Sequence, residues 1–207
     1  MIGRRTSPSL LALVLAAAPL AAQAPGLPTH GGGFTPGLTV AVTAGFGDSG
    51  SWGGKGTGYA GTVSWGFDRF AIGGTLGVLA ARDSGNPSRP TVGVMTSLRV
   101  LGGGVETPLA VFLQAGYGYL QNGPNGSWRV PLVAAFALTI PTPVVSLRPW
   151  LAPRLELTDG QDGRLDGNFG GSAGLDLSFI GGFQLRLLWD KVQAADRTLG
   201  AGAAFHF

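Results

Sequence analysis

Apolar side chains occupy every second position in ten segments of this 207-residue chain. In the segment 38–46, for example, Leu38, Val40, Val42 and Phe46 alternate with small or polar residues. Successive side chains of a β-strand point to opposite faces, so this pattern predicts strands with one apolar face. The other nine segments are residues 59–67, 70–78, 92–100, 109–119, 130–140, 145–155, 169–179, 183–189 and 198–207.

The chain is unusually apolar, and its apolar residues are spread over the ten alternating segments. Hydrophobic residues make up 44% of the sequence and charged residues only 12%, whereas about 25% is typical of soluble domains. A membrane helix would need an apolar stretch of about 20 residues, and the longest stretch after residue 24, residues 130–140, is much shorter. The sequence therefore predicts an all-β transmembrane barrel, in which one strand face meets lipid and the other a lumen.

The N-terminus has the features of a secretory signal peptide. Arg4 and Arg5 precede an apolar run at 10–22, and small residues follow, so cleavage is expected after Ala22 or Ala24. The predicted organisation is a signal peptide at 1–24, a periplasmic leader at 25–35 and the barrel at 36–207.

The connections between the segments alternate between short and long. This arrangement is typical of a closed antiparallel up-and-down barrel with an even number of strands, in which both termini and the short turns are periplasmic. We therefore predict ten strands. Because proline in a strand interior removes a ladder hydrogen bond, Pro149 and Pro153 in the segment 145–155 predict bulges or a shorter strand there. A barrel of eight strands is the alternative.

Aromatic residues cluster at the strand ends, as in the girdles that flank the apolar band of a membrane barrel. The predicted periplasmic ring comprises Phe67, Phe70, Phe179, Phe183, Phe205 and Phe207. The predicted outer ring comprises Phe46, Tyr59, Tyr119, Trp128, Phe169 and Trp189.

The strand phase also assigns the side chains that point into the lumen. The first three strands contribute Gly, Ala, Thr and Ser, whereas the later strands contribute long charged residues. Arginine and carboxylate side chains can satisfy one another by bidentate pairing, so we predict a network that fills a narrow lumen. Its members are Arg99, Arg148, Arg154, Glu156, Asp176, Arg186 and Asp190.

No catalytic, cofactor-binding or metal-binding residue is predicted. The segment 170–174 matches the Gly-x-Ser-x-Gly pattern, and Asp190 and His206 follow it in hydrolase order. That motif requires a turn from a strand into a helix, but here it lies within a predicted strand. The chain carries 14 basic residues, two of them in the signal peptide, against 11 acidic ones, so no nucleic-acid partner is expected.

The chain ends on a strand that carries Phe205 and closes with Phe207. With the signal peptide and the ten alternating segments, this ending resembles the small bacterial outer-membrane β-barrel proteins, including the barrel of the OmpA-like family. The resemblance implies insertion into outer-membrane lipid, with Phe205 and Phe207 as the signal for the barrel-assembly machinery. Periplasmic chaperones would be further partners during biogenesis.

Four functions are compatible with this sequence. The first is a non-enzymatic outer-membrane barrel with a structural or surface-interaction role, and the second is a narrow porin-like channel or transporter for small polar solutes. An outer-membrane enzyme and a secreted soluble barrel of lipocalin type are the other two. The sequence identifies no external ligand.

Overall fold

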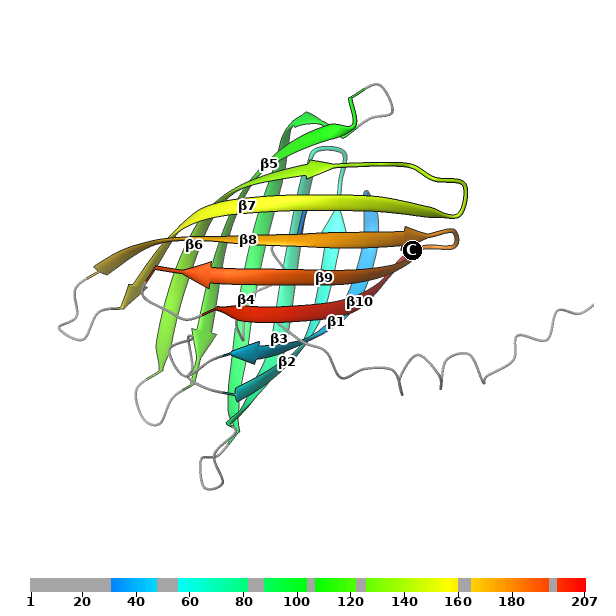
Figure 1. Ribbon diagram of the computed structural model, residues 1–207. Helices are drawn as coiled ribbons and strands as arrows, with labels where there is room; N and C mark the ends of the chain where they lie inside the picture. The colour runs from blue at the N-terminus through cyan, green and yellow to red at the C-terminus, as the bar shows by residue number, and fades with distance from the viewer. Residues whose placement is uncertain are drawn as a thin grey trace, which may run out of the picture.

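Ten β-strands form a closed barrel in the computed structural model (Figure 1), which describes residues 31–47, 56–81, 88–103, 107–121, 126–159, 165–193 and 197–207. The strands are β1 (Gly37–Gly47), β2 (Gly56–Gly66), β3 (Phe70–Ala81), β4 (Arg89–Gly102), β5 (Leu109–Leu120), β6 (Ser127–Leu138), β7 (Val145–Asp159), β8 (Leu165–Phe179), β9 (Phe183–Val192) and β10 (Thr198–His206). Within these described residues, no helix is long and apolar enough to cross a membrane.

Each strand pairs antiparallel with its neighbours in the sequence, and β1 pairs with β10 to close the sheet. The closing ladder runs from Thr39 opposite His206 to Gly47 opposite Thr198. A closed sheet leaves no row of unpaired backbone groups at an edge. The predictions of an all-β fold, a closed up-and-down barrel and ten strands rather than eight are therefore confirmed.

The two ends of the barrel differ. One end, called the turn end below, carries the start of β1, the end of β10 and the connections 67–69, 103–108, 139–144 and 180–182. The β8–β9 turn is tight because Gly181 and Gly182 have positive φ angles of 93° and 87°, a conformation that glycine adopts readily. The opposite end, where the other five connections begin, is called the loop end.

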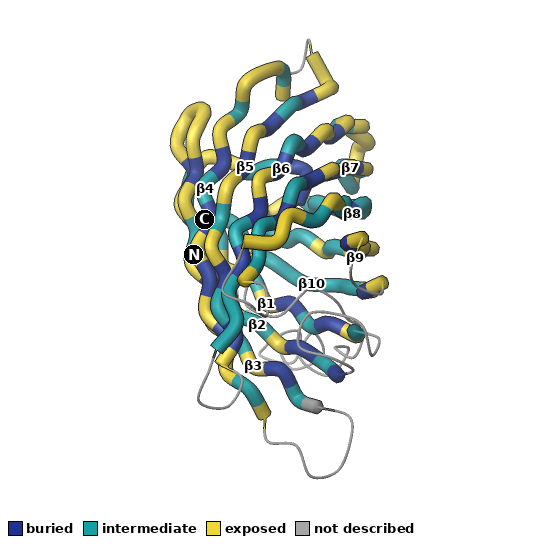
Figure 2. Tube along the Cα trace, turned by 90° about the vertical axis from the view of Figure 1, so that its left-hand side faces the viewer, coloured by how far each residue is buried: buried dark blue, intermediate teal, exposed yellow. Residues whose placement is uncertain are grey.

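Exposed and buried residues alternate along the strands (Figure 2). On β5, for example, Leu113 is exposed, whereas Phe112 and Gln114 on either side of it are buried. The exposed residues point outward and the buried ones into the barrel interior, called the lumen below. The alternation in the sequence thus predicted correctly which side chains share a face.

The prediction of bulges or a shorter strand at Pro149 and Pro153 is wrong. β7 is an unbroken strand of 15 residues, and its register with β8 is constant along its whole length. On the other side, the pairing of β7 with β6 skips Ala152 and Pro153 and then resumes in the same register. Proline has no N–H to donate, so the barrel accommodates it through a local gap in one ladder. Pro131 on β6 similarly lies at a gap in the β5–β6 pairing.

Candidate functional site

The lumen has two unlike walls. β1 to β4 present mainly small residues to it, and two of these, Thr62 and Thr75, share a buried hydrogen bond of 2.7 Å between their hydroxyl oxygens. β6 to β9 present long charged side chains instead. The small residues of the first wall leave space in the lumen for the long side chains of the second.

One group of charged residues lies toward the loop end and is called the loop-end cluster. It comprises Arg129, Arg154, Glu156, Ser172 and Asp190, all buried. Glu156 accepts hydrogen bonds from Arg129 Nη1 at 2.9 Å and from Arg154 Nε at 3.0 Å. Two arginines therefore face two carboxylates, and the formal charges of the cluster balance.

Arg154 is the centre of this cluster. Its Nη1 and Nη2 both donate to the carboxylate of Asp190, the second at 2.9 Å. Nη1 also donates to Ser172 Oγ at 2.7 Å, and the Ser172 hydroxyl donates to Asp190. Charge-assisted, two-armed bonds of this kind are stronger than neutral ones, so the cluster ties β6, β7, β8 and β9 together on their lumenal side.

A second group, called the turn-end cluster, comprises Trp150, Asp176 and Arg186. Arg186 donates from Nε and Nη2 to the two oxygens of Asp176, at 2.5 and 2.7 Å. The Trp150 indole N–H donates to the same carboxylate at 3.1 Å. Asp176 is fully buried, and these three donors satisfy it within the described part of the chain.

The remaining two predicted network members lie outside both clusters. The guanidinium of Arg148 lies 5.7 Å from the ring centroid of Phe112 and has no ion-pair partner among the described residues. Arg99 points to the turn between β2 and β3, where its Nη2 donates to the backbone carbonyl of Asp68 at 2.5 Å. The seven predicted residues therefore form two separate clusters and two outliers rather than one network.

Arg129 is the charged member of the loop-end cluster that sequence reasoning missed; Ser172, its uncharged member, was also not among the predicted network residues. The predicted strand began at residue 130, whereas β6 begins at Ser127. Val130 points outward, so a predicted strand that began at residue 127 would have placed the neighbouring Arg129 in the lumen.

The chain segment before β1 also enters the lumen. Of the predicted leader 25–35, the structure describes residues 31–35, and Gly31 and Gly32 are buried inside the barrel. Gln114 donates from Nε2 to the Gly31 carbonyl at 3.3 Å. Phe34 packs edge-on against Phe112, with 5.7 Å between the ring centroids. The segment 31–34 thus fills part of the barrel cross-section and is called the lumenal segment below.

Glycine is required in the lumenal segment because the surrounding side chains leave no space for a Cβ. A Cβ on Gly32 would lie 2.6 Å from the Cβ of Trp150 and 2.8 Å from that of Ala137. Gly33 has a φ of +112°, and a Cβ there would overlap the Phe112 ring. The backbone of these glycines therefore lies in direct contact with side chains of the lumen wall.

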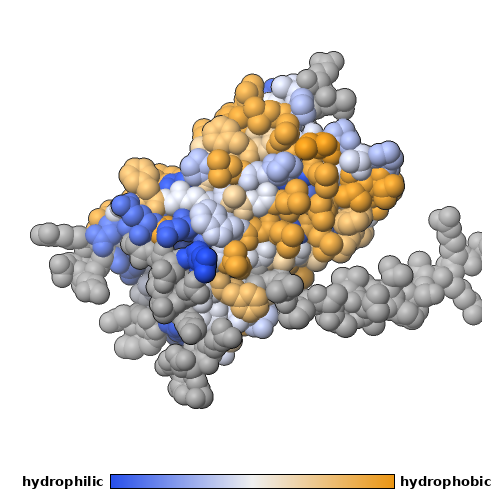
Figure 3. Space-filling view, viewed as in Figure 1, coloured by the Kyte–Doolittle hydropathy of each residue, from blue (hydrophilic) through white to orange (hydrophobic). Residues whose placement is uncertain are grey.

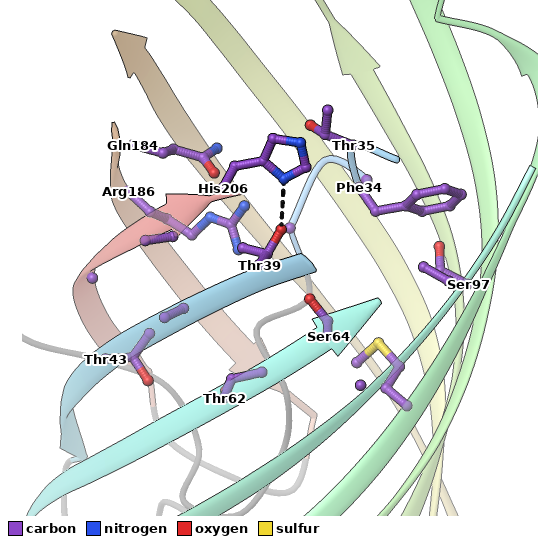
Figure 4. A pocket seen from close by; sticks show the side chains of 18 of the residues that line it. Phe34, Thr35, Thr39, Thr43, Thr62, Ser64, Ser97, Gln184, Arg186 and His206 are labelled. Carbon is purple, nitrogen blue, oxygen red and sulfur yellow. Dashed lines mark hydrogen bonds between the residues drawn. The ribbon is translucent and has the colours of Figure 1, made fainter. Parts of the chain in front are cut away.

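A cavity of about 140 Å³ remains in the lumen at the turn end. Figure 4 shows Thr39 and His206 on one side of it and Phe34 and Ser97 on another. The Thr39 hydroxyl and His206 Nδ1 share a hydrogen bond of 3.1 Å. His206 therefore lies at the base of the barrel, facing inward.

The three residues in hydrolase order do not form a triad. Ser172 and Asp190 are in contact near the loop end, but His206 bonds Thr39 at the turn end. Among the residues that the structure describes, no group of three or more His, Cys, Asp or Glu side chains is placed to hold a metal ion.

The two predicted assembly-signal residues are adjacent on the outer surface. Phe205 and Phe207 are both exposed, and their rings pack edge-on with centroids 4.8 Å apart. The N–H of Phe207 donates to the Leu38 carbonyl at 2.9 Å, so the last residue is held against β1.

Comparison with known proteins identifies no family. No family model matches the chain, and no curated protein matches its sequence. Among solved structures, the chain is similar to a bacterial polysaccharide outer membrane secretin, with a TM-score of 0.47 and 15% identity over 74% of this chain. The match spans 57% of that protein. Membership of the OmpA-like family therefore stays a prediction.

Proposed function

We propose that this protein is a non-enzymatic integral β-barrel of the bacterial outer membrane, with a structural or surface-interaction role and a closed lumen. One observation carries the proposal: large apolar side chains cover the outer face all around the barrel. They include the exposed residues Val42, Leu76, Leu113, Leu151 and Leu187, from five different strands. Soluble monomers rarely expose contiguous apolar patches larger than a few hundred Å², whereas lipid-facing barrel strands require them.

The distribution of polarity over the surface supports a membrane-spanning orientation. Figure 3 shows hydrophobic residues over the outer face of the strands, while the most hydrophilic ones gather on the left, where the longer connections begin. Membrane barrels have an apolar band of this kind with polar loops outside it. We infer that the turn end faces the periplasm and the loop end faces the outside.

Aromatic rings at both ends also support a barrel that spans the membrane. At the turn end the outward rings pack in pairs: Phe67 with Phe70 at 6.3 Å, and Phe179 with Phe183 at 5.8 Å between centroids. At the loop end, Tyr117 and Trp128 stack at 6.5 Å. Aromatic residues favour the level of the lipid headgroups, so these pairs are suited to the two membrane interfaces.

The interior supports a barrel that does not conduct. The loop-end cluster joins four strands across one wall, and the lumenal segment occupies space nearer the turn end. A pore large enough for solutes needs a continuous polar path. In this barrel, the ion pairs of the loop-end cluster and the packed backbone of the lumenal segment interrupt such a path at two heights.

The proposed partners are outer-membrane lipid, the barrel-assembly machinery and periplasmic chaperones. The exposed, adjacent Phe205 and Phe207 at the end of the closing strand support recognition by the assembly machinery.

Two measurements on the purified protein test the proposal. In flotation with phospholipid vesicles, the folded protein should rise with the lipid after a high-salt wash. In planar bilayers it should insert without discrete conductance steps. Failure to float would favour the soluble barrel, and regular discrete openings would favour the narrow channel.

A further inference from the structure

The cavity at the turn end is lined by basic and neutral residues. Arginine, histidine and glutamine side chains reach it, together with several Ser and Thr hydroxyls (Figure 4). None of the described residues that line it is Asp or Glu. The lining thus offers hydrogen-bond donors and two arginines, of which Arg186 is paired with Asp176 behind the lining.

Arg148 is the source of the uncompensated charge. The nearby carboxylate of Asp176 already accepts both arms of Arg186 and the indole N–H of Trp150. The Nε of Arg148 is buried and has no hydrogen-bond partner among the described residues, and its guanidinium lies over the Phe112 ring. Asp176 is opposite Arg148 in the β7–β8 ladder but forms no ion pair with it. A poorly solvated cation is costly unless it is paired and hydrogen-bonded.

Two further buried polar atoms at the cavity lack partners. Ser97 Oγ and Gln114 Oε1 form no hydrogen bond among the described residues, and these two residues lie opposite each other in the β4–β5 ladder. Buried polar atoms are nearly always satisfied by protein, water or a ligand. Three unsatisfied atoms on residues that line one cavity therefore indicate that something occupies it.

We propose that this cavity binds a small oxyanion of the phosphate or carboxylate class, with Arg148 as its charge partner. The hydroxyl of Ser97 is a further donor. The Gln114 oxygen can accept a hydrogen bond from the O–H of a monoprotonated or diprotonated phosphate, whereas beside a carboxylate it would need a water molecule. Cavities of about 150 Å³ hold a molecule as large as benzene, so the volume is sufficient. The proposal rests on the geometry of the lumen and not on insertion into a membrane.

Isothermal titration calorimetry tests the site directly. The purified protein, folded in a nonionic detergent that carries no phosphate, is titrated separately with inorganic phosphate and with acetate at constant ionic strength. At least one of the two should give a saturable heat with one site per chain. An absence of saturable heat with both anions would mean that water fills the cavity and would overturn the proposal.

Two variants test whether the anion binds at Arg148. Arg148→Met keeps much of the side-chain volume and should weaken binding about tenfold or more, because charge-assisted hydrogen bonds are lost. Arg69→Met removes an exposed arginine from the turn end and should leave the affinity unchanged. Equal affinities in Arg148→Met and in the unmodified protein would overturn the assignment.

A second substitution keeps the test valid if Arg148→Met does not fold. Ser97→Ala deletes only the hydroxyl and should weaken binding severalfold, with the heat-modifiable gel shift retained as evidence of folding. An unchanged affinity in this variant would exclude Ser97 from the site and count against the proposed location.

Discussion

Arg154 and Asp190 form a two-armed ion pair across an intervening strand. Arg154 belongs to β7 and Asp190 to β9, while Ser172 of β8 lies between them and bonds to both. Backbone ladders join only adjacent strands. This pair therefore adds a connection between strands that the sheet itself does not join, and it does so inside the lumen.

Arg154→Ala should strongly destabilise the barrel. The substitution leaves Asp190 buried without its cation and removes one of the two arginines on Glu156. Breaking a buried ion pair by removing one partner costs about 3–5 kcal/mol, measured as the free energy of unfolding by urea in detergent. The same variant should also show discrete openings in planar bilayers, because the loop-end cluster is opened.

The matched control is Arg69→Ala. Arg69 is an exposed arginine at the β2–β3 turn, and surface substitutions change the free energy of unfolding by about 0.5 kcal/mol or less. Adding Asp190→Leu to Arg154→Ala should restore part of the lost stability, since no unpaired charge at Asp190 then remains. A loss in Arg154→Ala no larger than in the control would contradict a structural role for the pair.

Gly32→Val should displace the lumenal segment. The new side chain meets the Cβ atoms of Trp150 and Ala137, both closer than van der Waals contact allows. Overpacking of a well-packed interior costs about 1–3 kcal/mol, and we expect the segment to leave the lumen at that cost. The free energy of unfolding should therefore fall, and discrete conductance steps should appear in planar bilayers.

Gly61→Val provides the control for this prediction. Gly61 is an exposed glycine on β2, and a Cβ at that position would meet nothing within 4 Å. Valine also favours strands, so this variant should be at least as stable as the unmodified protein and should not conduct. Equal behaviour of the two variants would mean that the lumenal segment does not depend on its fit to the wall.

The strands could be predicted because their signal is local. Alternation fixes the face of each side chain one residue at a time, and connection lengths fix the order, so even β7 with its prolines was placed correctly. The constant register of β7 was not predicted. β7 keeps its register because a gap in one ladder costs less than a shift that would turn every side chain to the other face.

The arrangement of the lumen was less accessible to sequence reasoning. Parity places Arg148 and Arg154 on the same face, but it cannot say that only Arg154 forms an ion pair, with a carboxylate two strands away on the same wall. Gly31, Gly32 and Gly33 carry no apolar pattern, so their entry into the lumen had no sequence signal. Pairing between side chains of distant strands depends on three-dimensional geometry that alternation does not encode.

Phe207→Ala should impair assembly in cells without weakening the folded barrel. Phe207 is 69% exposed and its ring packs on Phe205, so removal of the side chain should change the free energy of unfolding by less than about 1 kcal/mol. If the terminal aromatic is the assembly signal, the amount of heat-modifiable protein in the outer membrane should fall severalfold.

Phe169→Ala is the matched control for the assembly prediction. Phe169 is an equally exposed phenylalanine, at 70%, on the outer face of β8 toward the loop end. This variant should reach the outer membrane in normal amounts. A similar reduction in both variants would indicate a general need for outward aromatic residues rather than a terminal signal.

Leu76→Arg, compared with Leu165→Arg, tests whether the outward-facing surface of the barrel meets lipid. Leu76 is 70% exposed at the middle of β3, whereas Leu165 is 65% exposed at the first position of β8, at the loop end. In a bilayer, an outward arginine costs about 2–4 kcal/mol at the midplane and about 0–1 kcal/mol near the interface. Unfolding from phospholipid bilayers should therefore show a large loss for Leu76→Arg and a small one for Leu165→Arg. In water both positions would be solvated alike, so equal and small effects would contradict a membrane-spanning barrel.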